Sequence, residues 1–221
     1  AAMLRDRGLQ PGDRVGVMLP NLPAFPVIYY GVLRAGGVVV PMNPLLKSRE
    51  VAFYLGDSGA RWIFAFAGFA DEASKGAADA SAECVVVTPG DFEQSLAAVL
   101  PDTRVIEREP EDTAVILYTS GTTGKPKGAE LTHANLSKNA EVSTRLFTLT
   151  SDDVIFGGLP MFHSFGQTCA LNASVQTGAC VTLLPRFDPA SALETLQRDR
   201  VTIFEGVPTM YIAVLNHPER D

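Results

Sequence analysis

The chain has 221 residues, of which 46% are hydrophobic and 19% charged, and its formal net charge is −7. This composition is typical of a globular protein with one sizeable core or two small ones, and it excludes a disordered chain. The acidic balance argues against a nucleic-acid partner, which would need a basic face. No apolar run reaches the length of a membrane span and no signal peptide opens the chain, which is typical of a cytoplasmic protein. Peripheral contact with a membrane and the oligomeric state stay open.

Three cysteines are present, and none of them forms a C-x-x-C pair. They are Cys84, Cys169 and Cys180. This pattern favours free thiols in a reducing compartment over a disulfide framework or a zinc site.

Strands and helices are expected to alternate along the whole chain. Residues 1–8 are typical of the last turns of a helix, so the chain is expected to begin inside a longer protein. Strands are expected at residues 14–19, 38–40, 61–66, 84–87, 114–118, 153–156, 179–184 and 201–204. Helices are expected between them, with Asn21 as the N-cap of the first and Asp188-Pro189 opening a later one. One helix is expected at residues 164–177, stopped by Gly178.

This alternation predicts βαβ units, so the expected fold class is α/β, with doubly wound, mainly parallel sheets and flanking helices. A charged stretch bounded by prolines, residues 101–112, is the best candidate for a linker. We therefore expect a first α/β subdomain at residues 1–108, incomplete at its N-terminus, and a second at residues 109–221, incomplete at its C-terminus. Ligands of such sheets bind beyond the carboxyl ends of the strands.

The most informative stretch is Tyr118–Gly128, at the end of the apolar run 114–118. It contains no acid and no large aliphatic side chain. Glycines let backbone amides approach a ligand closely, hydroxyls add donors and lysines add positive charge, which together suit a polyphosphate. The candidate phosphate-binding residues are Thr119, Ser120, Gly121, Thr122, Thr123, Gly124, Lys125 and Lys127.

Two better-known phosphate loops do not fit this stretch. A Walker A loop needs a Ser or Thr after its lysine to hold magnesium, but Pro126 follows Lys125. The G-x-G-x-x-G spacing of dinucleotide-binding folds is absent too. A plain Ser/Gly-rich surface loop with solvated lysines is the remaining alternative.

The Tyr118–Gly128 stretch closely resembles the signature loop of the adenylate-forming (AMP-binding) superfamily, which includes acyl-CoA synthetases, adenylation domains of peptide synthetases and firefly luciferase. Two further stretches support this resemblance, namely Arg34–Pro44, with its glycines and P-x-N-P turn, and Leu159–Gly166, an aromatic-histidine segment. The resemblance implies part of the large N-terminal domain of an adenylate-forming enzyme. It covers nearly all of this chain but less than half of a family member.

The aromatic-histidine segment also helps to distinguish acyl-CoA synthetases from amino-acid adenylation domains within this superfamily. Taken alone, His163 between apolar residues is more often structural than catalytic. In acyl-CoA synthetases, however, this segment lines the acyl pocket, so the resemblance makes His163 the candidate catalytic residue, as a gate or orienting group. The resemblance likewise assigns Phe162, Phe165 and Val207 to an acyl pocket. Adenylation domains for amino acids usually have an aspartate where His163 stands, so an acid without an α-amine is expected.

The resemblance implies an AMP-forming, ATP-dependent acyl-CoA synthetase. The carboxylate of a fatty acid of medium or long chain would attack the α-phosphate of ATP, and coenzyme A would then displace AMP. Mg²⁺ would accompany ATP, with Thr122 as a candidate ligand. An aryl-acid CoA ligase or another adenylate-forming enzyme is an alternative. A nucleotide- or acyl-binding module without turnover is the alternative of another class, and Pro126 disfavours a kinase-like P-loop enzyme.

The family's later motifs are a Y-G-x-T-E stretch, a T-G-D aspartate and a small C-terminal domain with a catalytic lysine. None of them follows Tyr211 in this sequence. We therefore expect the adenine, ribose and catalytic-lysine residues to lie outside the chain, and the 221 residues alone to be inactive.

Overall fold

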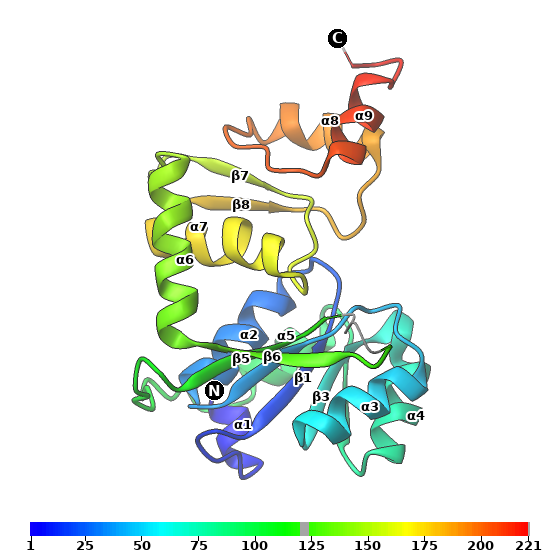
Figure 1. The fold of residues 1–221 in the computed structure, drawn as a ribbon, viewed down its shortest axis with the longest axis vertical. Helices are drawn as coiled ribbons and strands as arrows, with labels where there is room; N and C mark the ends of the chain where they lie inside the picture. Colours follow the sequence, from blue (N-terminus) through cyan, green and yellow to red (C-terminus); the bar gives the residue numbers. More distant parts are fainter. Residues whose placement is uncertain (120–123, 221) are drawn as a thin grey trace. The chain divides into compact units, whose positions relative to one another are not determined.

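The computed structural model describes residues 1–119 and 124–220. These residues fall into two compact units, one comprising residues 1–19 and 24–134, the other residues 20–23 and 135–221. Each unit has its own sheet and its own hydrophobic core, so each is described by itself (Figure 1).

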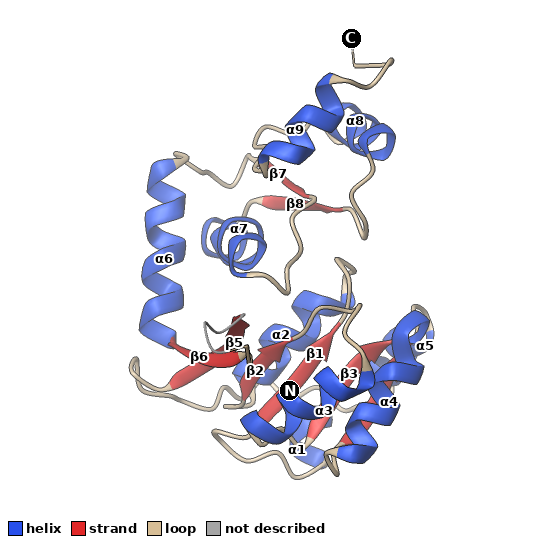
Figure 2. Ribbon diagram, turned by 45° about the vertical axis from the view of Figure 1, so that its right-hand side comes forward, coloured by secondary structure: helices blue, strands red, loops and turns tan. Residues whose placement is uncertain are grey.

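The first unit is built on a six-stranded sheet with the strand order β4-β3-β1-β2-β5-β6. Its strands are β1 (Arg14–Met18), β2 (Val38–Pro41), β3 (Trp62–Phe66), β4 (Glu83–Val87), β5 (Thr113–Thr119) and β6 (Lys127–Thr132). Its helices are α1 (Ala2–Asp6), α2 (Ala24–Arg34), α3 (Ser48–Ser58), α4 (Ala70–Asp79) and α5 (Asp91–Ala97), with a short 3-10 helix, η1 (Ala67–Phe69). The first five strands are parallel, and β6 is antiparallel to β5 (Figure 2).

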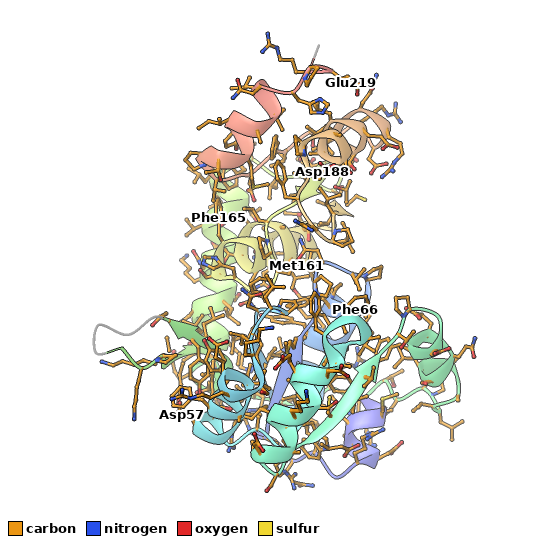
Figure 3. The ribbon with its side chains drawn as sticks, turned by 90° about the vertical axis from the view of Figure 1, so that its right-hand side faces the viewer. Asp57, Phe66, Met161, Phe165, Asp188 and Glu219 are labelled. Atoms are coloured by element: carbon orange, nitrogen blue, oxygen red, sulfur yellow. The ribbon has the colours of Figure 1, made fainter. Side chains whose placement is uncertain are left out.

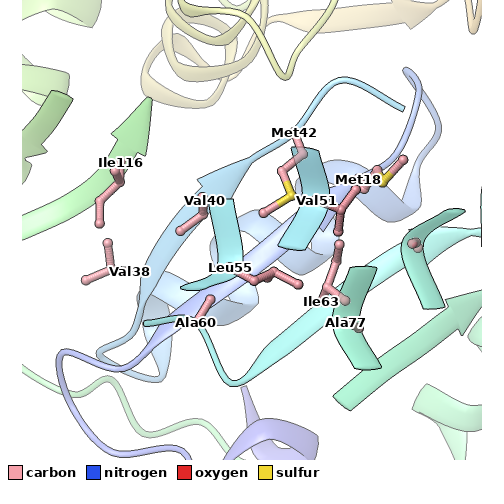
Figure 4. Close-up of a cluster of buried hydrophobic side chains, with 12 residues drawn as sticks. Met18, Val38, Val40, Met42, Val51, Leu55, Ala60, Ile63, Ala77 and Ile116 are labelled. Atoms are coloured by element: carbon pink, nitrogen blue, oxygen red, sulfur yellow. The ribbon is translucent and has the colours of Figure 1, made fainter. Parts of the chain in front are cut away.

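Alternate residues of the parallel strands form the core under α3 and α4. Val38 and Val40 of β2 and Ile63 of β3 pack against Val51 and Leu55 of α3 (Figure 4). The helix supplies apolar residues four positions apart, which lie on one face of an α-helix. The predicted α/β class with mainly parallel strands is therefore confirmed in this unit.

One strand of the first unit was not predicted. Strand β6 follows the candidate phosphate loop directly and pairs with β5 as the antiparallel edge of the sheet. Because β5 also pairs with β2, both strands belong to the first unit, whereas the sequence analysis had placed residues 109–132 with the second subdomain. A division at residues 108 and 109 stays a prediction for the complete protein.

The second unit is smaller and contains two parallel strands, β7 (Val154–Gly157) and β8 (Cys180–Leu183). Its helices are α6 (His133–Leu146, assigned to this unit from Asn135), the π-helix η2 (Gly166–Asn172), α7 (Ala173–Thr177), α8 (Pro189–Arg198) and α9 (Pro208–Leu215). The expected strand at residues 201–204 is reduced to a bridge between Ile155 and Ile203. The single helix expected at residues 164–177 is divided into the π-helix and α7.

Local signals placed most helix ends of this unit correctly. Asp188 accepts a hydrogen bond from the backbone N–H of Ser191 at 2.9 Å, as an N-cap does, with Pro189 in the first turn. Gly178 ends α7 with φ +77°, the left-handed conformation that glycine adopts readily. Asn21 is different, because its side chain makes hydrogen bonds to a distant segment instead of capping α2.

Among the described helices, none is both long and apolar enough to cross a bilayer. Cys84, Cys169 and Cys180 are free thiols.

Candidate functional sites

The candidate phosphate loop joins two adjacent strands of the first unit. It leaves the carboxyl end of β5 and returns as β6, with Thr119 opposite Lys127 and Tyr118 opposite Gly128 in the antiparallel ladder. The carboxyl end of β5 lies beside that of its parallel neighbour β2, where α/β sheets bind their ligands. No helix begins directly after the loop, because Lys127–Thr132 is a strand. A helix N-terminus immediately after the loop therefore cannot hold phosphate here, in contrast to a P-loop.

The described part of the loop is exposed and positively charged. Thr119, Gly124, Lys125 and Lys127 are all exposed. Gly124 has φ +83°, and a Cβ there would meet no other atom within 4 Å, so its backbone conformation, and not crowding, favours glycine. Neither lysine forms an ion pair with any residue that the structure describes. Their charge is thus available to an anion. Ser120, Gly121, Thr122 and Thr123 lie outside the described residues.

Tyr118, the first residue of the signature stretch, anchors the loop to α3. Its ring stacks on Tyr54 with ring centroids 4.0 Å apart, and its hydroxyl donates to the Asp57 carboxylate at 2.6 Å. Burial and the nearby Asp57 charge raise the pKa of the Tyr118 hydroxyl. Gly128 leaves room for this ring, because a Cβ on Gly128 would lie 3.3 Å from it and only 2.8 Å from Ile116.

The second unit has a candidate site of its own, in the segment after β7. Met161 is buried, Phe162 is half-buried, and His163 and Phe165 are exposed. Figure 3 labels Met161 and Phe165 on this segment, which leads into η2. The predicted acyl-pocket residue Val207 lies elsewhere in the unit, as the exposed N-cap of α9.

The His163 ring is oriented by the backbone two residues further along the chain. The N–H of Phe165 donates to His163 Nδ1 at 3.3 Å, so the neutral ring has its proton on Nε2. The His163 N–H donates to the Pro160 carbonyl, and the His163 carbonyl accepts from the Gln167 N–H at 2.9 Å. The π-helix that begins three residues later, at Gly166, is a rare conformation that occurs frequently at functional sites.

Sequence reasoning missed one buried acid in this unit. The Glu205 side chain is only 6% exposed, and neither of its carboxylate oxygens has a hydrogen-bond partner among the described residues. Burial raises the pKa of this carboxyl to about 7, and the nearby Cys169 thiol offsets only part of that increase. A single acid between Phe204 and Gly206, two residues before Val207, was the only sequence signal.

The whole of this chain, residues 1–221, matches the AMP-binding enzyme family model. The chain belongs to the AMP-binding enzyme family. The resemblance to adenylate-forming enzymes inferred from the Tyr118–Gly128 stretch is thereby confirmed.

The relatives of this AMP-binding chain are CoA ligases of several substrate classes. It is 34% identical to a long-chain-fatty-acid–CoA ligase of Bacillus subtilis, over 99% of this chain and 45% of the relative. It is 35% identical to a feruloyl-CoA synthase of Amycolatopsis, over 97% of this chain and 42% of the relative. The chain thus spans a little under half the length of the curated relatives it matches. Fatty and aryl acids are both represented among them.

Solved structures confirm the fold of this AMP-binding chain. A benzoate CoA ligase from Burkholderia xenovorans superposes with a TM-score of 0.91 at 29% identity, covering 100% of this chain and 45% of that one. ATP-bound MatB from Rhodopseudomonas palustris superposes with a TM-score of 0.88 at 33% identity, covering 98% of this chain and 43% of that one. The α/β architecture described above is thus that of the N-terminal domains of adenylate-forming enzymes.

The described residues fit ATP better than they fit a protein-bound metal. The exposed Lys125 and Lys127 follow Gly124, whose backbone is in the left-handed conformation, and this combination suits phosphate oxygens. The described residues contain no group of three or more His, Cys, Asp or Glu side chains that could hold a metal ion. The predicted Mg²⁺ contact of Thr122 falls outside the described residues, so it stays a prediction.

Proposed function

We propose that the protein containing this chain is an acid–thiol ligase that forms an acyl-adenylate from ATP and a carboxylic acid, and then an acyl-CoA. The observation that supports this best is the Thr119–Lys127 end of the β5–β6 hairpin. There Lys125 and Lys127 follow the carboxyl end of the parallel strand β5. Both are exposed, and neither forms an ion pair with a residue that the structure describes. Phosphoryl and nucleotidyl transfer asks a protein mainly for positioning and charge stabilisation, which this arrangement can supply.

In this proposal the residues have separate tasks. Thr119, Gly124, Lys125 and Lys127, together with residues 120–123, would bind the β- and γ-phosphates, each lysine contributing roughly 1.5–3 kcal/mol through charge-assisted hydrogen bonds. His163 would orient the acid, with Nε2–H as a donor, and Phe162, Phe165 and Val207 would contact its acyl group. Mg²⁺ would neutralise phosphate charge when bound with ATP. Coenzyme A would be the second substrate.

We propose a fatty acid of medium or long chain as the first substrate class, because the acyl-side residues are apolar and a long-chain ligase is among the relatives. One observation favours the aryl-acid alternative. Apart from the nearby Cys169 thiol, which is a weak donor, the described residues offer the buried Glu205 carboxyl no hydrogen bond; a hydroxylated ring could offer one, whereas a wholly aliphatic chain could not.

The test is ATP-dependent pyrophosphate release by the full-length gene product with a panel of fatty, aryl and hydroxylated aryl acids. Release that needs both ATP and an acid, followed by acyl-CoA formation on addition of coenzyme A, supports the ligase. ATP binding without pyrophosphate release for any acid would instead favour the non-catalytic binding module. Preference for an amino acid would contradict the argument from His163.

We further propose that the 221 residues alone do not turn over, because they match only about 45% of the length of the CoA ligases. The cytoplasm remains the proposed location. The comparison to make is between this chain and the full-length product in the same pyrophosphate assay. Equal rates would show that the catalytic residues lie within the chain.

A further inference from the structure

The Asn21 side chain binds three positions of one segment far away in the sequence. Its Nδ2 donates to the carbonyl of Gly157 at 2.9 Å and to that of Leu159 at 2.8 Å. Its Oδ1 accepts the N–H of Met161 at 2.9 Å. All three bonds are buried, and Asn21 itself is 3% exposed. Residues 20–23 belong to the second unit, so these contacts lie within it.

Only an asparagine-like amide satisfies this arrangement. Both N–H donors of Nδ2 are used on carbonyl oxygens, and Oδ1 is used on an N–H. The two carbonyls and the one N–H also fix the orientation of the amide, because a flipped side chain would face like groups at all three positions. An aspartate would keep the acceptor and lose both donors at neutral pH.

The segment that Asn21 holds leads directly to His163. Met161, which donates its N–H to Asn21, lies two residues before His163. The His163 N–H in turn donates to the carbonyl of Pro160 at 3.1 Å. Gly166 also packs against this segment, since a Cβ on Gly166 would lie 2.8 Å from the Leu159 carbonyl oxygen and closer still to that of Pro160. The backbone before His163 is thus bound by Asn21 and closely packed against Gly166.

We propose that Asn21 is a positioning residue, which sets the conformation of the Gly157–Met161 segment and through it the placement of the His163 ring. This inference rests on the proposed ligase function and assigns Asn21 no contact with a substrate. It predicts that loss of the two amide donors harms use of the acid, whereas binding of ATP, which we assign to the other unit's loop, is left intact.

The experiment compares Asn21→Asp with Leu149→Ala in the full-length product. Leu149 is buried in the core of the second unit and makes no contact with the Gly157–Met161 segment that the structure records, so it controls for a general loss of stability. We expect Asn21→Asp to lower kcat/KM for the acid roughly 10- to 100-fold, because small misplacements of an orienting group cost about that much. The KM for ATP should change less than about twofold. Leu149→Ala should leave both parameters near their wild-type values at a temperature where it is folded.

Three outcomes overturn the proposal. The first is an active wild-type enzyme whose Asn21→Asp variant keeps its kcat/KM for the acid. The second is an Asn21→Asp variant that impairs the use of acid and of ATP equally, together with a Leu149→Ala variant that shows the same impairment. The third needs no variant to fold: in the wild-type protein, the Met161 amide should be strongly protected from hydrogen exchange, and exchange at the rate of an open loop would refute the hydrogen bond. A wild-type protein that adenylates no acid would instead refute the proposed function as well.

Discussion

Thr119 lies directly opposite Lys127, where the antiparallel ladder between β5 and β6 reaches the candidate phosphate loop. The ladder places the Lys127 backbone beside the carboxyl end of a buried parallel strand, although its side chain is exposed. The backbone of Lys127, whose side chain provides part of the loop's positive charge, is therefore fixed by the hydrogen bonds of the sheet.

Lys127→Ala should raise the KM for ATP roughly tenfold, because one charge-assisted phosphate contact is lost. Lys75→Ala is the matched control, since Lys75 is also exposed but lies on α4. Pyrophosphate release at varied ATP and saturating acid is the measurement. If both variants behave like the wild type, Lys127 does not contact the phosphates.

His163→Ala should reduce turnover far more than stability. The ring is exposed, so the free energy of unfolding should change by no more than about 0.5 kcal/mol, whereas kcat/KM for the acid should fall roughly 10- to 100-fold. His217 is a matched control, because its Nδ1 accepts the N–H of Glu219 at 3.2 Å just as that of His163 accepts the N–H of Phe165. Thermal melts and rates on the same preparations test this, and a collapse of stability in His163→Ala would favour the structural interpretation of this residue.

Glu205→Gln should remove a pH dependence of stability. In the unfolded chain this carboxyl ionises near pH 4.5, whereas the folded protein keeps it protonated up to about pH 7. Between these values the folded state binds more protons, so the free energy of unfolding should fall as the pH rises from about 4.5 to 7, by roughly 3 kcal/mol at most.

Urea unfolding at pH 5 and pH 8 measures this effect. The wild type should lose more stability than Glu205→Gln between the two, and Glu219→Gln, at an exposed position, should follow the wild type. Identical pH profiles for wild type and Glu205→Gln would mean that the Glu205 carboxyl is solvated or paired.

Gly166→Ala should destabilise the second unit by roughly 1–3 kcal/mol, because its Cβ would meet backbone carbonyl oxygens that cannot move away freely. Gly56→Ala is the comparison variant, for which we expect the opposite effect on stability. Gly56 lies inside α3 with open space around its Cβ position, so alanine there should stabilise by about 0.5–1 kcal/mol. Thermal unfolding of the two variants should shift in opposite directions, and a neutral Gly166→Ala would show that the segment before His163 is loosely packed.

Apolar runs and turn residues were enough to predict most of the parallel strands and helices. Ala114–Ile116 is a run buried in the sheet. That the segment after it binds phosphate, inferred from its glycines, hydroxyls and lysines, stays a prediction. Strand β6 escaped prediction because an exposed edge strand needs no apolar alternation. Its residues Lys127–Glu130 are all exposed, and only the ladder with β5 makes them a strand.

The candidate sites were only partly predictable, because the surroundings of two polar residues, Asn21 and Glu205, are set by parts of the chain that are distant in sequence. Asn21 was interpreted as a helix cap, which is the local role of an asparagine before a helix, but its partners lie 136 to 140 residues further along the chain. Glu205 had no local signal of burial beyond its apolar neighbours. A single sequence shows what a side chain can do locally, and it does not show which backbone groups the fold brings to it.

The pairing of β5 with β6 has a consequence for exchanging the loop between members of the family. Thr119 and Lys127 lie opposite each other in the β5–β6 ladder, so the segment between them starts and ends at neighbouring positions of the sheet. The residues assigned to the acid lie in the other unit, with its separate core. If the proposed roles hold, nucleotide binding and acid selection are encoded in separate parts of the chain, and we expect a loop transplanted between relatives with different acids to carry its ATP affinity with it and to leave the choice of acid unchanged.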